Sequence, residues 1–193
     1  MEITGRIHQR GLALFRILVG IIFLWAGIEK LVAAEPFSAA GFLKFGTAGT
    51  LGWPFVSGTP AEGTIFNPTH DIWVGLAAND GLTGIVNLLV VWGEIGIGIG
   101  LILGLFTRFS AAMGTLMMLL FFFAAWDFAY GIVNQHLTYA IVCATLTGLG
   151  AGRYYGLDGA LASRVPAAVR RYLMSGDAGT ADDSQRETFP VTA

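Results

Sequence analysis

The chain has 193 residues, of which 54% are hydrophobic and 12% charged, and its formal net charge is −2. Soluble domains carry about 25% charged residues, so the composition excludes an ordinary soluble enzyme and predicts an all-α integral membrane protein. A membrane β-barrel is excluded as well, because the apolar runs are continuous rather than alternating. The length leaves room for one small four-helix bundle, and no nucleic-acid partner is expected.

Four segments approach the roughly 20 apolar residues that a helix needs to cross about 30 Å of hydrocarbon. They cover about residues 11–33, 82–106, 109–126 and 135–152, and they predict a four-span membrane domain over residues 1–158. Basic residues lie on the N-terminal side of the first segment, between the second and third segments, and after the fourth, with Arg16 inside the start of the first. They are Arg6, Arg10, Arg16, Arg108, Arg153, Arg164, Arg170 and Arg171. Because cytoplasmic loops carry an excess of Lys and Arg, we expect a multi-pass cell-membrane protein with both termini in the cytoplasm.

The remaining segments have distinct compositions. Residues 34–81 form a long outer connection rich in Gly, Pro and aromatic residues, which predicts an ordered cap with a short helix near residues 38–45. Residues 159–174 combine regularly spaced apolar residues with arginines, which predicts an amphipathic helix on the inner membrane surface, interrupted at Pro166. Residues 175–193 are polar and acidic, and we expect a disordered tail.

Glu94 is the only charged residue of the second apolar segment. A carboxylate at such depth costs roughly 2.5–3.5 kcal/mol and usually marks a path for protons, ions or substrate. Two interpretations are open from the sequence. Glu94 is either a neutral acid hydrogen-bonded to a neighbouring helix, or the ion-pair partner of Lys30 or Arg16.

The other polar candidates are predicted to lie at the same depth in the membrane, near its outer face. Glu29 and Lys30 end the first apolar segment, Asp127 follows the third, and His136 begins the fourth, with Tyr139 one turn deeper. They form either one site or the ordinary charged flanks of membrane helices. No second His or Cys has the spacing of a metal ligand, so we expect no metal site.

Glycines recur along one side of the second segment at Gly93, Gly96, Gly100 and Gly104. Such small-xxx-small spacing is typical of close contact between membrane helices. It predicts a tight seam within the bundle or between two copies of the chain.

Several short pieces of the chain occur in a characteristic order between residues 14 and 158. They are Phe23-Leu24-Trp25-Ala26-Gly27 with Lys30-Leu31, then Gly41-Phe42-Leu43, Leu103-Gly104, Asn134-Gln135-His136 with Tyr139, Gly150-Ala151-Gly152-Arg153 and Gly156-Leu157-Asp158. Together they resemble the DoxX/DoxD family of small four-helix membrane proteins. The family includes the DoxD-type subunit of thiosulfate:quinone oxidoreductase, so the resemblance implies electron transfer from thiosulfate to a membrane quinone. Glu29 stands where the family usually has Asp, and Asn134-Gln135 stand where acidic residues are familiar.

The favoured hypothesis is a quinone-linked membrane redox protein. The resemblance suggests that it is a subunit of a thiosulfate:quinone oxidoreductase. In this hypothesis His136 and Glu29 donate to the quinone oxygens, Glu94 relays protons and Lys30 gives electrostatic support. The remaining candidates for contact with quinone are Trp25, Trp92, Trp126, Tyr139, Asp127 and Arg16.

The sequence contains no CxxC pair, haem-attachment motif or set of iron–sulfur cysteines. Beyond the lipid bilayer, we therefore expect a membrane-protein partner or a second copy of the chain. Two alternatives are a non-catalytic anchor or assembly subunit of a larger respiratory complex, and a small transporter or proton channel that uses Glu94.

Overall fold

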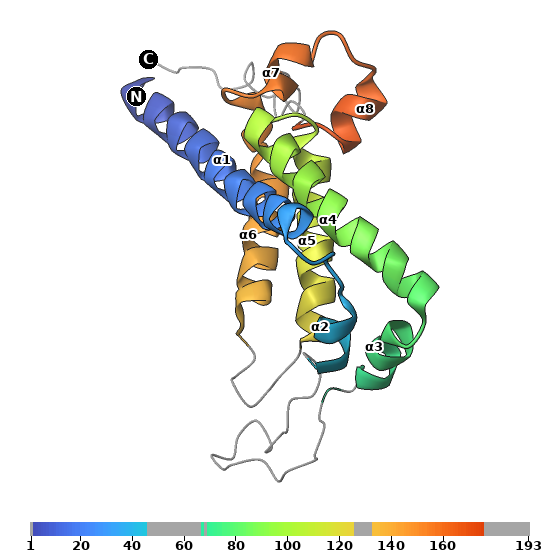
Figure 1. Ribbon diagram of the computed structural model, residues 1–193. Coiled ribbons are helices and arrows are strands. Elements are labelled where there is room, and N and C mark those ends of the chain that lie inside the picture. Colours follow the sequence, from blue (N-terminus) through green and yellow to red (C-terminus); the bar gives the residue numbers. More distant parts are fainter. Residues whose placement is uncertain (1, 46–66, 68, 126–132, 176–193) are drawn as a thin grey trace, which may run out of the picture.

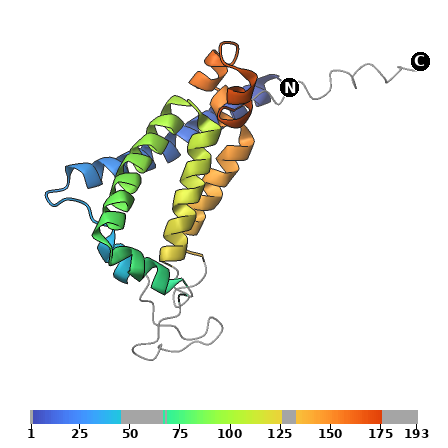
Figure 2. The ribbon, with the colours of Figure 1, turned by 90° about the vertical axis from the view of Figure 1, so that its right-hand side faces the viewer.

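The computed structural model describes residues 2–45, 67, 69–125 and 133–175, and this part of the chain contains helices and turns but no strand. Four long helices form the bundle (Figures 1 and 2). They are α1 (Glu2–Val32), α4 (Asp80–Leu103), α5 (Thr107–Ala124) and α6 (Gln135–Leu149). The shorter elements are α2 (Ala40–Phe45), α3 (His70–Ala77), the 3-10 helix η2 (Ala151–Arg153), α7 (Leu157–Leu161) and α8 (Ala167–Tyr172).

Three of these helices are long and apolar enough to cross a membrane: Ile7–Val32, Asp80–Leu103 and Thr107–Ala124. The predicted class, an all-helical membrane protein, is confirmed. Helix α6 has 15 residues, about 22 Å at 1.5 Å per residue, which is shorter than the hydrocarbon layer. A fourth crossing therefore stays a prediction.

The bundle consists of two closely packed helix pairs, α1 with α4 and α5 with α6. Helices α4 and α5 share a smaller contact. They meet at their short connection and separate toward α2 and α3, as Figure 1 shows. Helix α1 ends beside the middle of α4, so the first half of α4 extends past it toward α2 and α3.

Glycines explain how closely α1 and α4 pack. A Cβ atom added to Gly98 would lie 2.5 Å from the backbone nitrogen of Leu24, and one added to Gly20 would lie 2.9 Å from the carbonyl oxygen of Gly98. A Cβ added to Gly27 would lie 2.7 Å from the side-chain Cγ1 of Ile95 and 3.0 Å from its backbone nitrogen. The backbones of α1 and α4 are thus in contact, which larger residues at these positions would prevent.

The predicted glycine seam lies on another face of α4 and is not a continuous tight contact. Gly93 and Gly100 admit side chains of α5, but a Cβ added to Gly96 between them would meet nothing within 4 Å. Gly104 has a φ of +63° and ends α4 in the left-handed conformation that glycine favours. Within one chain the seam is interrupted at Gly96, where the small residue leaves space open, and a seam between two copies stays a prediction.

Helices α2 and α3, which we call the cap, join the separated ends of α4 and α5. The side-chain oxygen of Asn87 on α4 accepts a hydrogen bond from the backbone N–H of Ala39, at 2.7 Å. The side-chain nitrogen of Asn67 donates to the carbonyl oxygen of Phe123 at the end of α5, at 2.9 Å. The predicted short helix is confirmed as α2, whereas α3 lies in a region predicted to be loop. The rest of the predicted cap, residues 46–66 and 68, lies outside the described residues.

The opposite end of the bundle, which we call the basic end, is closed by the C-terminal segment. The carboxylate of Asp158 is buried and accepts hydrogen bonds from the backbone N–H groups of Phe106, Thr107 and Ser175, at 2.8 to 3.0 Å. Two of these donors belong to the start of α5, so one carboxylate fastens both α7 and the end of the C-terminal segment to the bundle. The segment contains two short helices separated at Pro166, as predicted, and the predicted tail from residue 176 lies outside the described residues.

Candidate functional site: a cleft between two helices

An apolar cleft of about 1050 Å³ lies between α4 and α5. Ligand pockets usually hold about 300–1,000 Å³, so this cleft is at the upper end of that range. Its α4 side extends from Val86 to Gly100, about 21 Å at 1.5 Å per residue. The shape suits a long apolar molecule better than a compact polar one.

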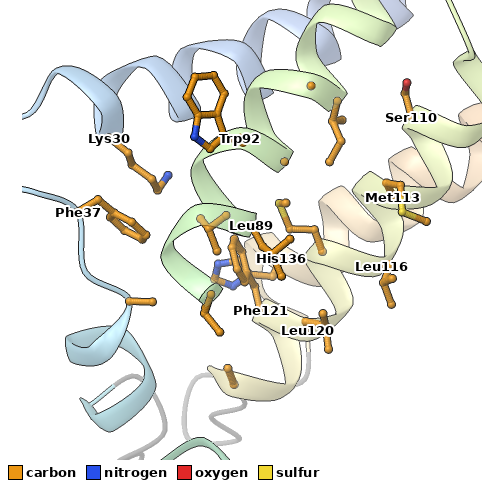
Figure 3. A pocket seen from close by; sticks show the side chains of 18 of the residues that line it. Lys30, Phe37, Leu89, Trp92, Ser110, Met113, Leu116, Leu120, Phe121 and His136 are labelled. Carbon is orange, nitrogen blue, oxygen red and sulfur yellow. The ribbon is translucent and has the colours of Figure 1, made fainter. Parts of the chain in front are cut away.

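The two walls differ in side-chain size. The α4 wall contains Gly93, Gly96 and Gly100 among larger apolar residues, and its backbone is accessible at Gly96. The α5 wall carries larger apolar side chains: Phe109, Met113, Leu116, Met117, Leu120 and Phe121. Figure 3 shows Met113, Leu116 and Leu120 along α5, among the side chains that line the cleft. The space therefore arises from small residues on α4 opposite large residues on a helix that diverges from it.

The cap closes one end of the cleft with aromatic and aliphatic side chains. Phe37, Phe42 and Leu43 come from the chain around α2, and Trp73 and Leu76 come from α3. The indole N–H of Trp73 donates to the hydroxyl of Thr69 at 2.8 Å, which leaves its ring facing the apolar space.

His136 is the titratable group at this end. Its ring packs edge-to-face against Phe121 of α5, with centroids 5.8 Å apart, and against Phe42 of the cap, at 6.0 Å. Helix α6 begins beside it, because Asn134 caps the helix by accepting from the N–H of Leu137. No hydrogen bond joins the imidazole to another described residue, so its nitrogens are available to a ligand.

Lys30 reaches the cleft from the opposite side of α4 (Figure 3). Its ammonium group donates to both carboxylate oxygens of Glu94, at 3.0 and 2.9 Å, and lies 5.6 Å from the ring centre of Phe37. It also donates to the carbonyl oxygen of Ala26 at 3.3 Å. Of the two partners left open by the sequence, the structure places Lys30 beside Glu94.

Arg16 lies at the basic end, away from Glu94. It is fully buried and donates to the carbonyl oxygens of Ala151 and Tyr155, at 3.0 and 3.3 Å. It therefore holds η2 and the following turn against α1 and does not line the cleft.

Only some of the polar residues that were expected to lie together at the outer end of the bundle do so. Lys30 was expected at the same depth as His136, and the end of α1 beside the middle of α4 places it against Glu94, one of the two partners that the sequence left open. Glu29 is exposed and does not line the cleft. Asp127 lies outside the described residues.

The aromatic residues that were expected to line a pocket for the quinone ring also lie apart from one another. Trp92 lines the cleft and is 56% exposed at its mouth. Trp25 is exposed elsewhere on α1, and Tyr139 packs against the core between α5 and α6. Trp126 lies outside the described residues. The sequence reasoning did not assign Phe42 and Phe121, which contact His136, to the site.

No group of three or more His, Cys, Asp or Glu in the described part of the chain could hold a metal ion. Cys143 is buried in the core and its Sγ would lie 3.0 Å from a Cβ added to Gly114. This thiol therefore has a packing role between α6 and α5.

The family model described as DoxX matches residues 11–127. The chain belongs to the DoxX family. The match covers both Lys30 and Glu94, both walls of the cleft and the cap, whereas His136 follows it on α6. This DoxX protein is thus a helical membrane protein, and most of its cleft lies within the residues that the family model matches. No curated protein and no solved structure matches it.

Proposed function

We propose that this DoxX protein binds an isoprenoid quinone in the α4–α5 cleft and is the quinone-binding subunit of a membrane redox system. The observation that carries the proposal is a long apolar cleft with an imidazole that forms no hydrogen bond with another described residue and lies between two aromatic rings at its capped end. An isoprenoid quinone has the matching parts, a long apolar tail and a flat ring with carbonyl oxygens.

The quinone ring binds beside His136 in this proposal. Phe42 and Phe121 offer ring faces and edges for the offset or edge-to-face contacts that aromatic groups prefer. The imidazole N–H donates to one quinone carbonyl oxygen. The tail follows the cleft past Gly96 and leaves toward the lipid.

Reduction of a quinone to a quinol takes two electrons and two protons. The electrons come from a partner that carries a redox centre and oxidises a reduced sulfur compound such as thiosulfate. His136 transfers one proton to the ring oxygen that it contacts and recovers it from water at the capped end, and water also supplies the second proton to the other ring oxygen. Lys30 remains paired with Glu94 on the other side of α4, so this pair has no net charge. Glu29 and Trp25 drop out of this proposal, because they are exposed outside the cleft.

The orientation is also part of the proposal. We place both termini and the basic end in the cytoplasm and the capped end of the cleft at the outer face, with α6 as a fourth span. The arginines of the basic end support this orientation through the charge bias of cytoplasmic loops. Labelling of single cysteines introduced at Ser38 and Arg164, in a Cys143→Ala background, tests it from the two sides of the membrane.

Quinone content after purification tests the proposal. Gly96→Leu fills the cleft, and Gly84→Leu is a matched control on the same helix, because neither position has an atom within 4 Å of an added Cβ and Gly84 does not line the cleft. Both changes raise helix propensity, so neither should impair folding. We expect extraction to recover quinone from wild type and Gly84→Leu but to recover at least tenfold less from Gly96→Leu.

A turnover assay separates binding from redox activity. His136→Ala should lower quinone reduction by the reconstituted complex, with thiosulfate as donor, while leaving the amount of partner subunit bound unchanged. Wild-type protein that contains no quinone and shows no quinone-dependent turnover, yet binds a partner in fixed ratio, would be an assembly subunit and the proposal would be wrong.

A further inference from the structure

The basic end carries a group of arginines on its surface that is separate from the cleft's polar groups. Arg108 begins α5, Arg170 and Arg171 lie in the last turn of α8, and Arg164 lies in the turn between α7 and α8. Within the described residues, none of these guanidinium groups forms an ion pair with a carboxylate. Their charges are therefore available to an anionic partner.

Hydrogen bonds hold α8, which carries Arg170 and Arg171, beside Arg108. The guanidinium of Arg108 donates to the carbonyl oxygen of Arg171 at 2.7 Å, and the N–H of Phe109 donates to the carbonyl oxygen of Leu173 at 3.1 Å. These two bonds hold α8 against the start of α5. Arg170 precedes Arg171 on α8, and its guanidinium donates to the carbonyl oxygen of Ala162 at the end of α7, at 3.1 Å.

Exposed apolar side chains adjoin this charge. Phe106 and Phe109 are 37% and 47% exposed and line the end of the cleft next to Arg108. Tyr172 follows Arg171 and is 69% exposed. A cationic group directly beside exposed aromatic surface fits an amphipathic anion better than a free inorganic ion.

We propose that Arg108, Arg170 and Arg171, together with Phe106 and Phe109, bind one anionic phospholipid, and we call these residues the α5–α8 surface. The guanidinium groups bind the headgroup phosphate, for which their paired N–H donors are suited. The acyl chains lie along Phe106 and Phe109 at the cleft end. The site shares Phe106 and Phe109 with the end of the cleft, but its arginines and the headgroup that they bind are separate from the residues assigned to the quinone ring.

The test measures binding of phosphatidylglycerol to the full-length protein in detergent micelles, by lipid-dependent thermal stability and by native mass spectrometry, with phosphatidylcholine as the neutral lipid. Arg171→Gln is the main variant, since its side chain makes no hydrogen bond with another described residue and its loss should not affect folding. Arg164→Gln removes the same charge outside the surface and is the matched control. Each basic residue near a membrane surface contributes about 1 kcal/mol, which corresponds to about a fivefold change in Kd at 1.4 kcal/mol per tenfold.

We expect phosphatidylglycerol to bind wild type and Arg164→Gln equally, and Arg171→Gln about fivefold more weakly. Equal binding of the two lipids to wild type would overturn the proposal. Equal weakening by Arg164→Gln and Arg171→Gln would also overturn it, because the arginines would then attract the lipid through their overall charge and not through direct contact with the headgroup. Binding that appears only after deletion of residues 176–193 would show that the chain's own acidic tail occupies the surface, and would also overturn it.

Discussion

The contribution of the Lys30–Glu94 ion pair to the free energy of unfolding can be predicted from its burial and its hydrogen bonds. The Glu94 side chain is 4% exposed and that of Lys30 is 26% exposed, and the two groups share two hydrogen bonds. Removing one partner of a buried ion pair typically destabilises a protein by about 3–5 kcal/mol, because the other charge is left uncompensated. Lys30→Met should therefore lower the free energy of unfolding by about this amount.

Glu94→Gln should be milder. Lys30 keeps its bond to the carbonyl oxygen of Ala26 and its position over the ring of Phe37. The variant loses charge-assisted hydrogen bonds, which contribute about 1.5–3 kcal/mol. The double variant Lys30→Met/Glu94→Gln should lose at least about 2 kcal/mol less than the sum of the single variants, since it leaves no unpaired charge.

The assay is equilibrium unfolding in mixed micelles, with rising mole fraction of a denaturing detergent and tryptophan fluorescence as the signal. Glu29→Gln is the control, because it removes a neighbouring but exposed carboxylate and should change stability by no more than about 0.5 kcal/mol. If the losses of the two single variants add in the double variant, the pair is not energetically coupled and the reasoning is refuted.

Two further changes test the packing. Gly98→Ala should lower the free energy of unfolding by about 1–3 kcal/mol, because its Cβ would lie 2.5 Å from the backbone of α1, whereas Gly84→Ala should raise it by up to about 1 kcal/mol; similar values for the two would contradict the close α1–α4 contact. Asp158→Asn should speed tryptic cleavage at Arg164 and Arg170 severalfold, because an amide offers one acceptor oxygen where the carboxylate accepts three backbone N–H bonds. An unchanged cleavage rate in Asp158→Asn would mean that this carboxylate does not fasten the C-terminal segment.

Much of the fold follows from apolar runs and from local stop signals. The apolar stretches predicted α1, α4 and α5, and Gly104 and Gly150, both with positive φ, end α4 and α6 within a few residues of the expected limits. Pro166 predicted the division of the C-terminal segment. These features could be predicted because each depends on residues close together in sequence.

The site was harder to predict, because it depends on helix inclination. Sequence spacing placed Lys30 and His136 at one level, but α1 ends beside the middle of α4 and Lys30 meets Glu94 there. Likewise, Gly96 has the spacing of a contact residue, and only the divergence of α4 from α5 makes it a cleft wall. Helix inclination is set by side-chain packing between distant segments, which a single sequence does not display.

The most direct measurement of the central claim is photoaffinity labelling of the purified protein with an azido-quinone, followed by peptide mapping. We predict labelled residues on α5 between Met113 and Phe121 and near His136, with labelling suppressed by excess unmodified quinone and by Gly96→Leu but not by Gly84→Leu. Labelling confined to the exposed face of α1 around Leu18 and Trp25, or labelling unaffected by Gly96→Leu, would contradict the account.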